Sequence, residues 1–467
     1  MSDEATSNNS MQHHIPAIVM MMIGAFIAVL NQTLMTTVIP KIMEEFHLTS
    51  GTAQWLTTIF MLVNGIMIPI TAYLTQRFSL RRLFFTAMLL FVVGSLLCML
   101  APNFTLLLVG RAIQAMGAGI LMPLTQMFSF LVFPLEKRGM AMGLFGLVIG
   151  FAPAIGPTAA GWFVTAFDWR YLFLIILIIS VIDLLFGYFK MMDLTELSKP
   201  KLDILSVILS TIGFGGLLFG FSSASQFGWG NPIIYLTLLV AVVALVTFVM
   251  RQLKLETPML EIRVFQYRAF TIPISLVILM FLIFIGTLTI LPIYMQTMRG
   301  LTPLQSGLIL LPGGLVMGLL SPVTGKLYDI IGGRILAVSG MTLIFIGTLL
   351  LSFLNAESSI TYIILSFLVM MLGNSGIMVP MTTEALNALP RELIPHGTAM
   401  NNTLRQISAA IGTGLLVTLL SQLAMGHGGS TVASHIFGLQ WTYKVVAVLS
   451  LIWAFIALRV SKKESSN

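Results

Sequence analysis

Long apolar runs separated by short polar or basic segments dominate the sequence. Fourteen of these runs reach the roughly 20 residues that an α-helix needs to cross a bilayer. They lie at about residues 16–38, 53–75, 83–101, 104–130, 139–165, 170–189, 203–223, 232–251, 269–296, 304–325, 335–354, 360–384, 397–422 and 440–459. The pattern therefore predicts an all-α integral membrane protein with fourteen transmembrane helices.

The composition excludes a sizeable soluble domain. Of the 467 residues 57% are hydrophobic and only 9% are charged, whereas a soluble domain has about 25% charged residues. Fourteen crossings use about 280 residues, so the loops must be short. The sequence contains no GxxxxGK[ST] phosphate loop, which argues against ATP as an energy source.

The net charge of +7 predicts an orientation rather than a nucleic-acid partner, because the basic residues lie between the apolar runs. An even number of crossings puts both termini on one side. If that side is the cytoplasm, eighteen Lys and Arg residues lie on inner segments and four on outer ones, namely Lys41, Arg170, Arg299 and Lys444. The polar start of the chain, with Asp3 and Glu4, is unlike a secretory signal. We therefore expect a multi-pass plasma-membrane protein with cytoplasmic termini.

An internal repeat divides the chain into two copies of a six-helix unit. VIPKIMEEFHLT from residue 38 matches ILPIYMQTMRGLT from residue 290, Pro123 matches Pro380 within similar segments, and GMAMG at 139 recurs as GTAMN at 397. The predicted parts are a tail (1–14), a first bundle (15–190), an inserted helix pair with its linkers (191–268), a second bundle (269–460) and a tail (461–467). Parallel repeats of this kind typically bind a substrate between them near the bilayer midplane.

Two corresponding loops carry the same motif. The loop after the second helix reads AYLTQRFSLRR, and the loop after the tenth reads GKLYDIIGGR. Both resemble the G-x-L-x-D-x-x-G-x-[RK] motif of the major facilitator superfamily, and the resemblance implies a gate formed by Gln76, Arg77, Arg81, Gly325, Asp329 and Arg334. Gln76 replaces the acid of the motif, so a latch there must be hydrogen-bonded, or the ionic role moves to Asp329. A second interpretation is that these arginines only anchor the topology.

Further segments resemble one branch of this superfamily, the fourteen-helix drug:proton antiporters. LLLVGRAIQAMGAG (106–119) is similar to the motif of the fourth helix, and DWRYLF and NNTLRQI also match the branch. GLVIGFAPAIGPTAAGW is similar to the antiporter motif of the fifth helix, through Gly150, Pro153, Gly156, Pro157 and Gly161. The resemblance implies proton-driven export of hydrophobic or amphipathic drugs by alternating access, without a cofactor. On its own, the glycine pattern would also fit ordinary helix packing.

The acid that carries the proton is not evident, because Asn31 stands where the family commonly has aspartate, and asparagine cannot titrate. The candidates are Glu384, which is better placed by its helix, Asp183, which is better placed by depth, and Asp168, which could pair with Arg111. Arg111 would tune the acid's pKa. The alternative interpretation is that each of these three acids only caps a helix end or packs between helices.

Polar residues inside predicted helices are the candidates for substrate binding, because lipid does not favour them. They are Asn31, Gln32, Thr33, Gln54, Gln114, Asn374, Asn401, Asn402, Arg405 and Gln406. Each also fits a hydrogen bond between helices. The low acid count favours neutral, zwitterionic or singly charged substrates. No cluster has metal-ligand spacing, and Cys98 is expected to be a packing residue.

The expected partners are small-molecule drugs, protons and the lipid bilayer, with no nucleic acid, and the expected state is a monomer from a bacterium. The alternative function is transport of a lipid or metabolite, because a fold does not fix its substrate. A membrane enzyme is disfavoured by the lack of a nucleophile, base and orienter set. A membrane sensor is disfavoured by the lack of a soluble output domain.

Overall fold

The computed structural model describes residues 2–191, 203–429 and 431–461, and these residues form helices and short connections without any β-strand. Within these ranges fourteen helices are long and apolar enough to cross a membrane, which agrees with the predicted number. They are α1 (Ser2–Phe46), α2 (Ser50–Arg77), α3 (Leu80–Met99), α4 (Phe104–Val132), α5 (Arg138–Ala166), α6 (Arg170–Lys190), α7 (Ile204–Phe227), α8 (Pro232–Lys254), α9 (Arg268–Ile293), α10 (Pro303–Ile331), α11 (Gly333–Leu351), α12 (Ile360–Asn387), α13 (Ile394–Gly426) and α14 (Val432–Ala457).

Short one-turn helices lie in the connections. They are η1 (Leu135–Lys137), η2 (Ile262–Gln266), η3 (Tyr294–Met298) and η4 (Arg391–Leu393). The helix α1 begins at Ser2, so residues predicted as a polar tail are helical. Residues 192–202 of the predicted linker and 462–467 of the predicted C-terminal tail lie outside the described residues.

Polar side chains at the loop ends fix where several helices begin. Thr49, Ser79 and Asn103 each accept a hydrogen bond from a backbone N–H in the first turn of the following helix. Thr302 and Gln305 form a reciprocal capping box at the start of α10. Such caps satisfy N–H groups that have no partner inside the helix. They allow the short loops that the composition demands.

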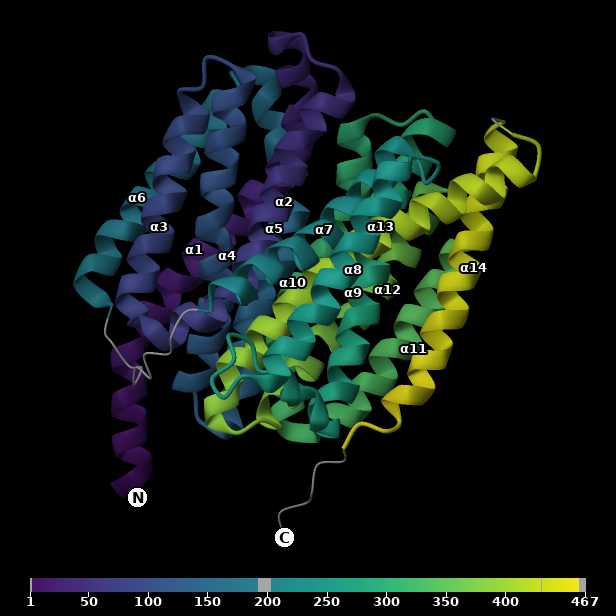
Figure 1. The fold of residues 1–467 in the computed structure, drawn as a ribbon. Helices are drawn as coiled ribbons and strands as arrows, with labels where there is room; N and C mark the ends of the chain where they lie inside the picture. Colours follow the sequence, from purple (N-terminus) through teal and green to yellow (C-terminus); the bar gives the residue numbers. More distant parts are fainter. Residues whose placement is uncertain (1, 192–202, 430, 462–467) are drawn as a thin grey trace.

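The helices form two bundles, α1–α6 and α9–α14. The start of α1 and the end of α14 lie at the same end of the molecule (Figure 1). We call this the terminal end and the opposite one the far end. Close glycine contacts between neighbouring helices occur in both bundles. A Cβ on Gly94 of α3 would lie 2.5 Å from the backbone nitrogen of Gln114 in α4, and a Cβ on Gly373 of α12 would lie 2.6 Å from the carbonyl oxygen of Gly340 in α11.

The helices α5 and α10 form the main contact between the bundles. A Cβ on Gly139, at the terminal end, would lie 2.3 Å from the Gly325 carbonyl oxygen, and one on Gly150 would lie 2.9 Å from the backbone of Gly318. Near the far end, the nearest α10 atom to a Cβ on Gly161 is a side-chain atom of Leu304 at 4.0 Å. The two helices therefore approach closely at the terminal end and more loosely at the far end.

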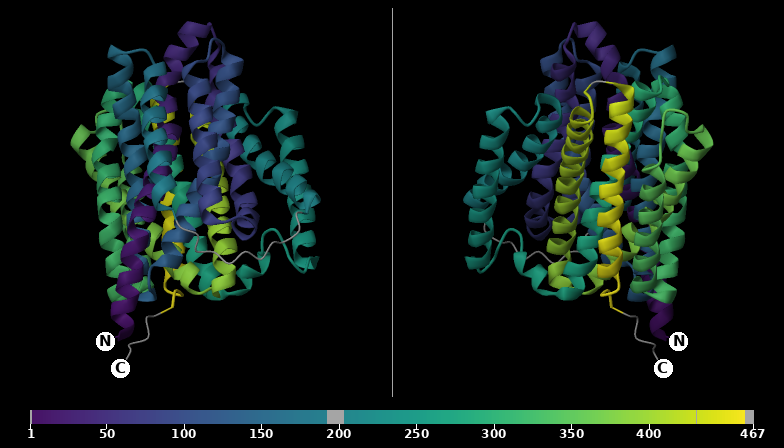
Figure 2. Two further views of the ribbon diagram at one scale, coloured as in Figure 1. Left: turned by 90° about the vertical axis from the view of Figure 1, so that its left-hand side faces the viewer. Right: turned by 90° about the vertical axis from the view of Figure 1, so that its right-hand side faces the viewer.

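The inserted pair α7 and α8 lies at one edge of the molecule, where Figure 2 shows it in teal. Its inner helix α7 packs against α2 of the first bundle and α13 of the second. Leu218 of α7 reaches the Gly65 position of α2, and the Phe221 carbonyl of α7 lies against Gly414 of α13. The pair therefore bridges the two bundles, with α8 packed on the outside of α7.

Candidate functional site

Two contacts between the bundles at the terminal end, which we call latches, involve residues of the gate motif. The first is made by Asp329, in the last turn of α10. Its Oδ1 accepts a hydrogen bond from the Gly139 N–H at 2.9 Å, and its Oδ2 accepts one from the Met140 N–H at 3.0 Å. Both donors belong to the first turn of α5, where the helix dipole places positive charge. Gly139 and Gly325 contact each other beside this carboxylate. Asp329 thus caps a helix of the other bundle.

The second latch lies at the corresponding place of the repeat, between α2 and α13. The Nε2 atoms of Gln76 and His396 lie 3.1 Å apart. His396 Nδ1 also accepts a hydrogen bond from the Glu261 N–H at 3.2 Å, just before η2. Because Nδ1 accepts a hydrogen bond, a neutral His396 carries its proton on Nε2, which faces the Gln76 amide. His396 thus contacts both the first bundle and the segment that follows α8.

A chain of hydrogen bonds connects Glu384 to the first bundle. Tyr328 donates its hydroxyl proton to Glu384 Oε2 at 2.8 Å, and Asn387 Nδ2 donates to the Tyr328 hydroxyl at 3.2 Å. Arg138 of α5 donates to Asn387 Oδ1 at 2.9 Å. Nearby, Asn402 of α13 donates to Gln126 of α4 at 2.5 Å. Among the three candidates for the proton-carrying acid, Glu384 is thus linked by hydrogen bonds to the contact between the bundles.

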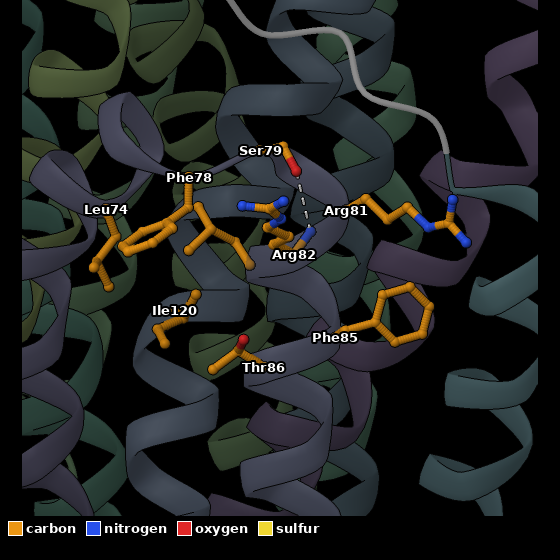
Figure 3. A pocket seen from close by; sticks show the side chains of 9 residues that line it. Leu74, Phe78, Ser79, Arg81, Arg82, Phe85, Thr86 and Ile120 are labelled. Atoms are coloured by element: carbon orange, nitrogen blue, oxygen red, sulfur yellow. Dashed lines mark hydrogen bonds between the residues drawn. The ribbon is translucent and has the colours of Figure 1, made fainter. Parts of the chain in front are cut away.

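The loop between α2 and α3 lines a pocket at the terminal end (Figure 3). Arg81 donates a hydrogen bond to the Tyr188 carbonyl at 3.2 Å and lies 5.5 Å from the centre of the Tyr188 ring. Arg77 ends α2 as an exposed residue, and Arg334 is half-buried in the first turn of α11. Arg81 also lies 5.9 Å from the centre of the Phe85 ring on α3, so these contacts are with α3 and α6 of the first bundle.

Arg111 is fully buried in the first bundle and has polar partners there. It donates to the Leu56 carbonyl at 3.3 Å and to Gln114 Oε1 at 3.1 Å, and it lies over the Phe60 ring. Gln114 Oε1 also accepts from Asn31 at 3.1 Å, and Gln114 Nε2 donates to Ser95 at 2.8 Å. Two of the substrate candidates, Asn31 and Gln114, are therefore members of one buried network.

Asp168 does not pair with Arg111, so that expectation is wrong. Its side chain is 47% exposed and lies 3.6 Å from Arg170 in the loop before α6. Arg170 also binds Glu45 at 2.7 Å, and this hydrogen bond lowers the pKa of Glu45. The local Asp168–Arg170 pairing arises because Arg170 is two residues away, whereas Arg111 is enclosed by α2 and α4.

Asp183 is buried, whereas Asp168 is exposed. It is 4% exposed, and its Oδ2 has no hydrogen-bond partner. A Cβ on Gly24 of α1 would lie 3.2 Å from this oxygen, and the same Cβ would lie 3.2 Å from the sulfur of Met88 in α3. Asp183 therefore lies between α1, α3 and α6, away from the contact between the bundles.

The glycines of the antiporter motif let α5 approach two other helices. Gly150 contacts α10, and a Cβ on Gly156 would lie 2.3 Å from Thr33 Oγ1 of α1. The Thr33 hydroxyl is also 3.5 Å from the Ala152 carbonyl. Pro153 is half-buried in α5, which continues through Pro157 to Gly161.

In the second bundle, several buried polar atoms lack hydrogen-bond partners. They include Asn374 Oδ1, both amide atoms of Asn401, Arg405 Nε and Gln406 Nε2. Arg405 lies over the Phe281 ring, 4.1 Å from its centre. The remaining substrate candidates, Gln32 and Gln54, are half-buried on α1 and α2. Within the described part of the chain, no three His, Cys, Asp or Glu side chains are grouped as metal ligands.

The sequence analysis did not identify His396, Tyr328 or Phe281. His396 directly precedes GTAMN, the repeat of the α5 segment that Asp329 caps, so the repeat contained a signal for it. Tyr328 directly precedes Asp329 in the gate motif. Phe281 lies in an unbroken apolar run, and nothing in the sequence marks it.

Comparison with known proteins gives a consistent family. The family model for the Major Facilitator Superfamily matches residues 21–413. The chain is 50% identical to the MFS-type transporter YcnB of Bacillus subtilis over 94% of both chains. It is 40% identical to the lincomycin resistance protein LmrB of Listeria monocytogenes over 99% of this chain and 98% of that protein.

A solved structure shows the same fold. The human organic anion transporter MFSD10 superposes with a TM-score of 0.69 at 13% sequence identity, covering 95% of this chain and 99% of that one. At this identity the likeness concerns the fold alone.

Proposed function

This chain belongs to the major facilitator superfamily and to its drug-efflux branch, and we propose that it exports amphipathic drugs in exchange for protons. The observation that carries the proposal is the 40% identity, over nearly the full length of both chains, to a lincomycin resistance protein. The buried polar side chains of α12 and α13 supply groups that would bind a substrate within the membrane.

The contacts between the bundles support alternating access with the terminal end closed. Hydrogen bonds that Asp329 and Gln126 accept and Arg138 donates, together with the Gln76–His396 contact, join the bundles there. At the far end α5 and α10 are looser. Breaking a few hydrogen bonds would release the terminal end. Following the positive-inside rule, we take this end as cytoplasmic, so that this structure represents an outward-facing carrier.

Glu384 is the acid that we propose for proton coupling. While it is ionised, it accepts a hydrogen bond from the Tyr328 hydroxyl, so that the hydrogen bonds from Arg138 through Asn387 and Tyr328 all donate toward Glu384. A protonated Glu384 becomes a donor and no longer holds this chain by charge. Protonation would therefore weaken the cytoplasmic contact and favour the inward-facing state, which is the sense that drug:proton exchange requires.

The test is substrate-induced proton movement in inverted vesicles that carry the purified protein and an imposed pH gradient. We expect ethidium or lincomycin to dissipate the gradient with the unmodified protein and not with Glu384→Gln. Glu357→Gln, which removes an exposed loop carboxylate, is the matched control. Dissipation that persists in Glu384→Gln and disappears in Asp183→Asn would move the coupling to Asp183. No dissipation by the unmodified protein, with drug export intact, would refute proton exchange.

A further inference from the structure

Arg405 is a buried cation near the middle of the second bundle. It lies about three turns from the terminal end of α13 and is 7% exposed. Its guanidinium carbon lies 4.1 Å from the centre of the Phe281 ring of α9. Across the described residues, Arg405 forms no hydrogen bond or ion pair, and its Nε is buried without an acceptor. One face of the guanidinium is therefore covered, while its donors are unused.

Arg111 shows what a structural arginine looks like in the same protein. Its guanidinium has an aromatic ring on one face, as Arg405 does, but its Nε donates to a backbone carbonyl and its Nη1 to the Gln114 amide, so that only Nη2 is buried without a partner. A buried guanidinium is expensive unless acceptors surround it. Arg405 lacks these acceptors, so packing and internal hydrogen bonds do not account for its burial.

The helix α13 presents further unused polar atoms close to Arg405 in the sequence. Both amide atoms of Asn401, one turn before Arg405, and Nε2 of Gln406 are buried without hydrogen-bond partners. Native proteins leave few such atoms, and a group of them indicates a ligand or bound water. Asn402, on the same stretch, contacts Gln126 of the first bundle. This contact places the stretch of α13 beside the first bundle, and carriers built from parallel repeats bind their substrates between the bundles.

We propose that Arg405 binds the carboxylate of an amphipathic organic acid, so that the exported substrates include monoanions with an aromatic or aliphatic body. This inference rests on the proposed function and names its substrate class. A guanidinium matches a carboxylate with two parallel hydrogen bonds. Since Phe281 covers one face, the carboxylate binds at the edge, where Nε lacks an acceptor. The Asn401 and Gln406 amides supply donors beside it, and no described acid pairs with Arg405 to compete.

The test compares 4-(1-pyrenyl)butyric acid with its methyl ester, which differ only in the charged group. Binding is measured by pyrene fluorescence on the full-length protein in nanodiscs. We expect the unmodified protein to prefer the acid by about tenfold to a hundredfold, as hydrogen bonds to charged groups allow. Arg405→Gln should abolish this preference, and Arg405→Lys should keep part of it. Lys444→Gln removes a cation that lies over Trp441 on the peripheral helix α14 and should leave the preference unchanged.

Thermal unfolding separates ligand binding from a structural role. Because the unpaired charge costs stability, ligand-free Arg405→Gln should be at least as stable as the unmodified protein, and pyrenylbutyrate should stabilise only proteins that retain the cation. Lower stability of the ligand-free variant, or equal binding of acid and ester by the unmodified protein, overturns the proposal. If ethidium is still exported in that case, only the anion site is wrong, whereas loss of all drug export refutes the proposed function itself.

Discussion

The carboxylate of Asp329 caps the first turn of α5 across the boundary between the bundles, accepting hydrogen bonds from the N–H groups of Gly139 and Met140 at 2.9 and 3.0 Å. A helix N-terminus attracts an anion because its first N–H groups point outward without partners. The cap holds only while α5 and α10 meet at the terminal end. A capping interaction, which usually forms within one helix and its preceding loop, thus serves here as a contact between the two bundles.

Asp329→Asn should loosen the terminal end. The amide keeps one acceptor but loses the charge and one of the two hydrogen bonds, and hydrogen bonds to charged groups contribute about 1.5–3 kcal/mol. We therefore expect the inward-facing population to rise about tenfold or more. The measurement is the distance distribution between spin labels at Lys137→Cys and Glu392→Cys in a Cys98→Ser background, which should shift to longer values.

Gly139→Ala tests the same contact without changing charge. Its Cβ would lie 2.4 Å from Asp329 Oδ1 and 2.3 Å from the Gly325 carbonyl oxygen, so the capping geometry cannot form. Gly51→Ala, where a Cβ meets nothing within 4 Å, serves as the control. Unchanged label distances in both Asp329→Asn and Gly139→Ala would show that this cap does not hold the bundles together.

Gln76→Asp should strengthen the second latch. Gln76 occupies the position that corresponds to Asp329, next to the start of α13, yet it meets His396 as a neutral amide. An aspartate there would face the α13 N-terminus and accept a hydrogen bond from the His396 Nε2–H, which adds a charge-assisted contact while Nδ1 still accepts from the Glu261 N–H. We expect slower ethidium export with unchanged ethidium binding, because opening at the terminal end becomes harder. Gln76→Glu, which keeps the side-chain length that reaches His396, should do so at least as much. Faster export by either variant would contradict this role.

The fold was predictable from the sequence because its signals are local and repeated. Apolar runs of bilayer length fixed the number of helices, and the GMAMG and GTAMN segments marked α5 and α13 as equivalent. The site was less predictable because its partners are distant in sequence. Asp329 was recognised, but its actual partners are backbone N–H groups, which no side-chain pattern reveals. Likewise, the Arg170 pairing of Asp168 depends on a loop conformation.

Gln114→Leu should destabilise the first bundle strongly. Gln114 accepts hydrogen bonds from Asn31 and Arg111 and donates one to Ser95. Its loss would leave a buried charge with fewer acceptors, which typically costs about 3–5 kcal/mol. The measurement is thermal unfolding in detergent. Gln114→Glu keeps the acceptors beside Arg111 and should retain most of the stability, so equal losses in the two variants would show that size alone matters at this position.

The stability of the α7–α8 pair should depend on pH through Asp203, which directly precedes α7. Arg251 donates hydrogen bonds to its carboxylate at 2.6 and 2.9 Å, and these contacts lower the pKa of Asp203 to about 2. Since the unfolded chain has a pKa of about 3.9 for aspartate, ionised Asp203 stabilises the fold above about pH 4, and the stabilisation is lost as the pH falls toward 2. Asp203→Asn should therefore lower the unfolding temperature at pH 7 and have less effect at pH 3. The difference should be small, because both partners are partly exposed. Asp168→Asn, at the other end of the molecule, provides the comparison. If Asp203→Asn lowers the unfolding temperature equally at pH 7 and pH 3, the Arg251 contact does not stabilise the folded pair.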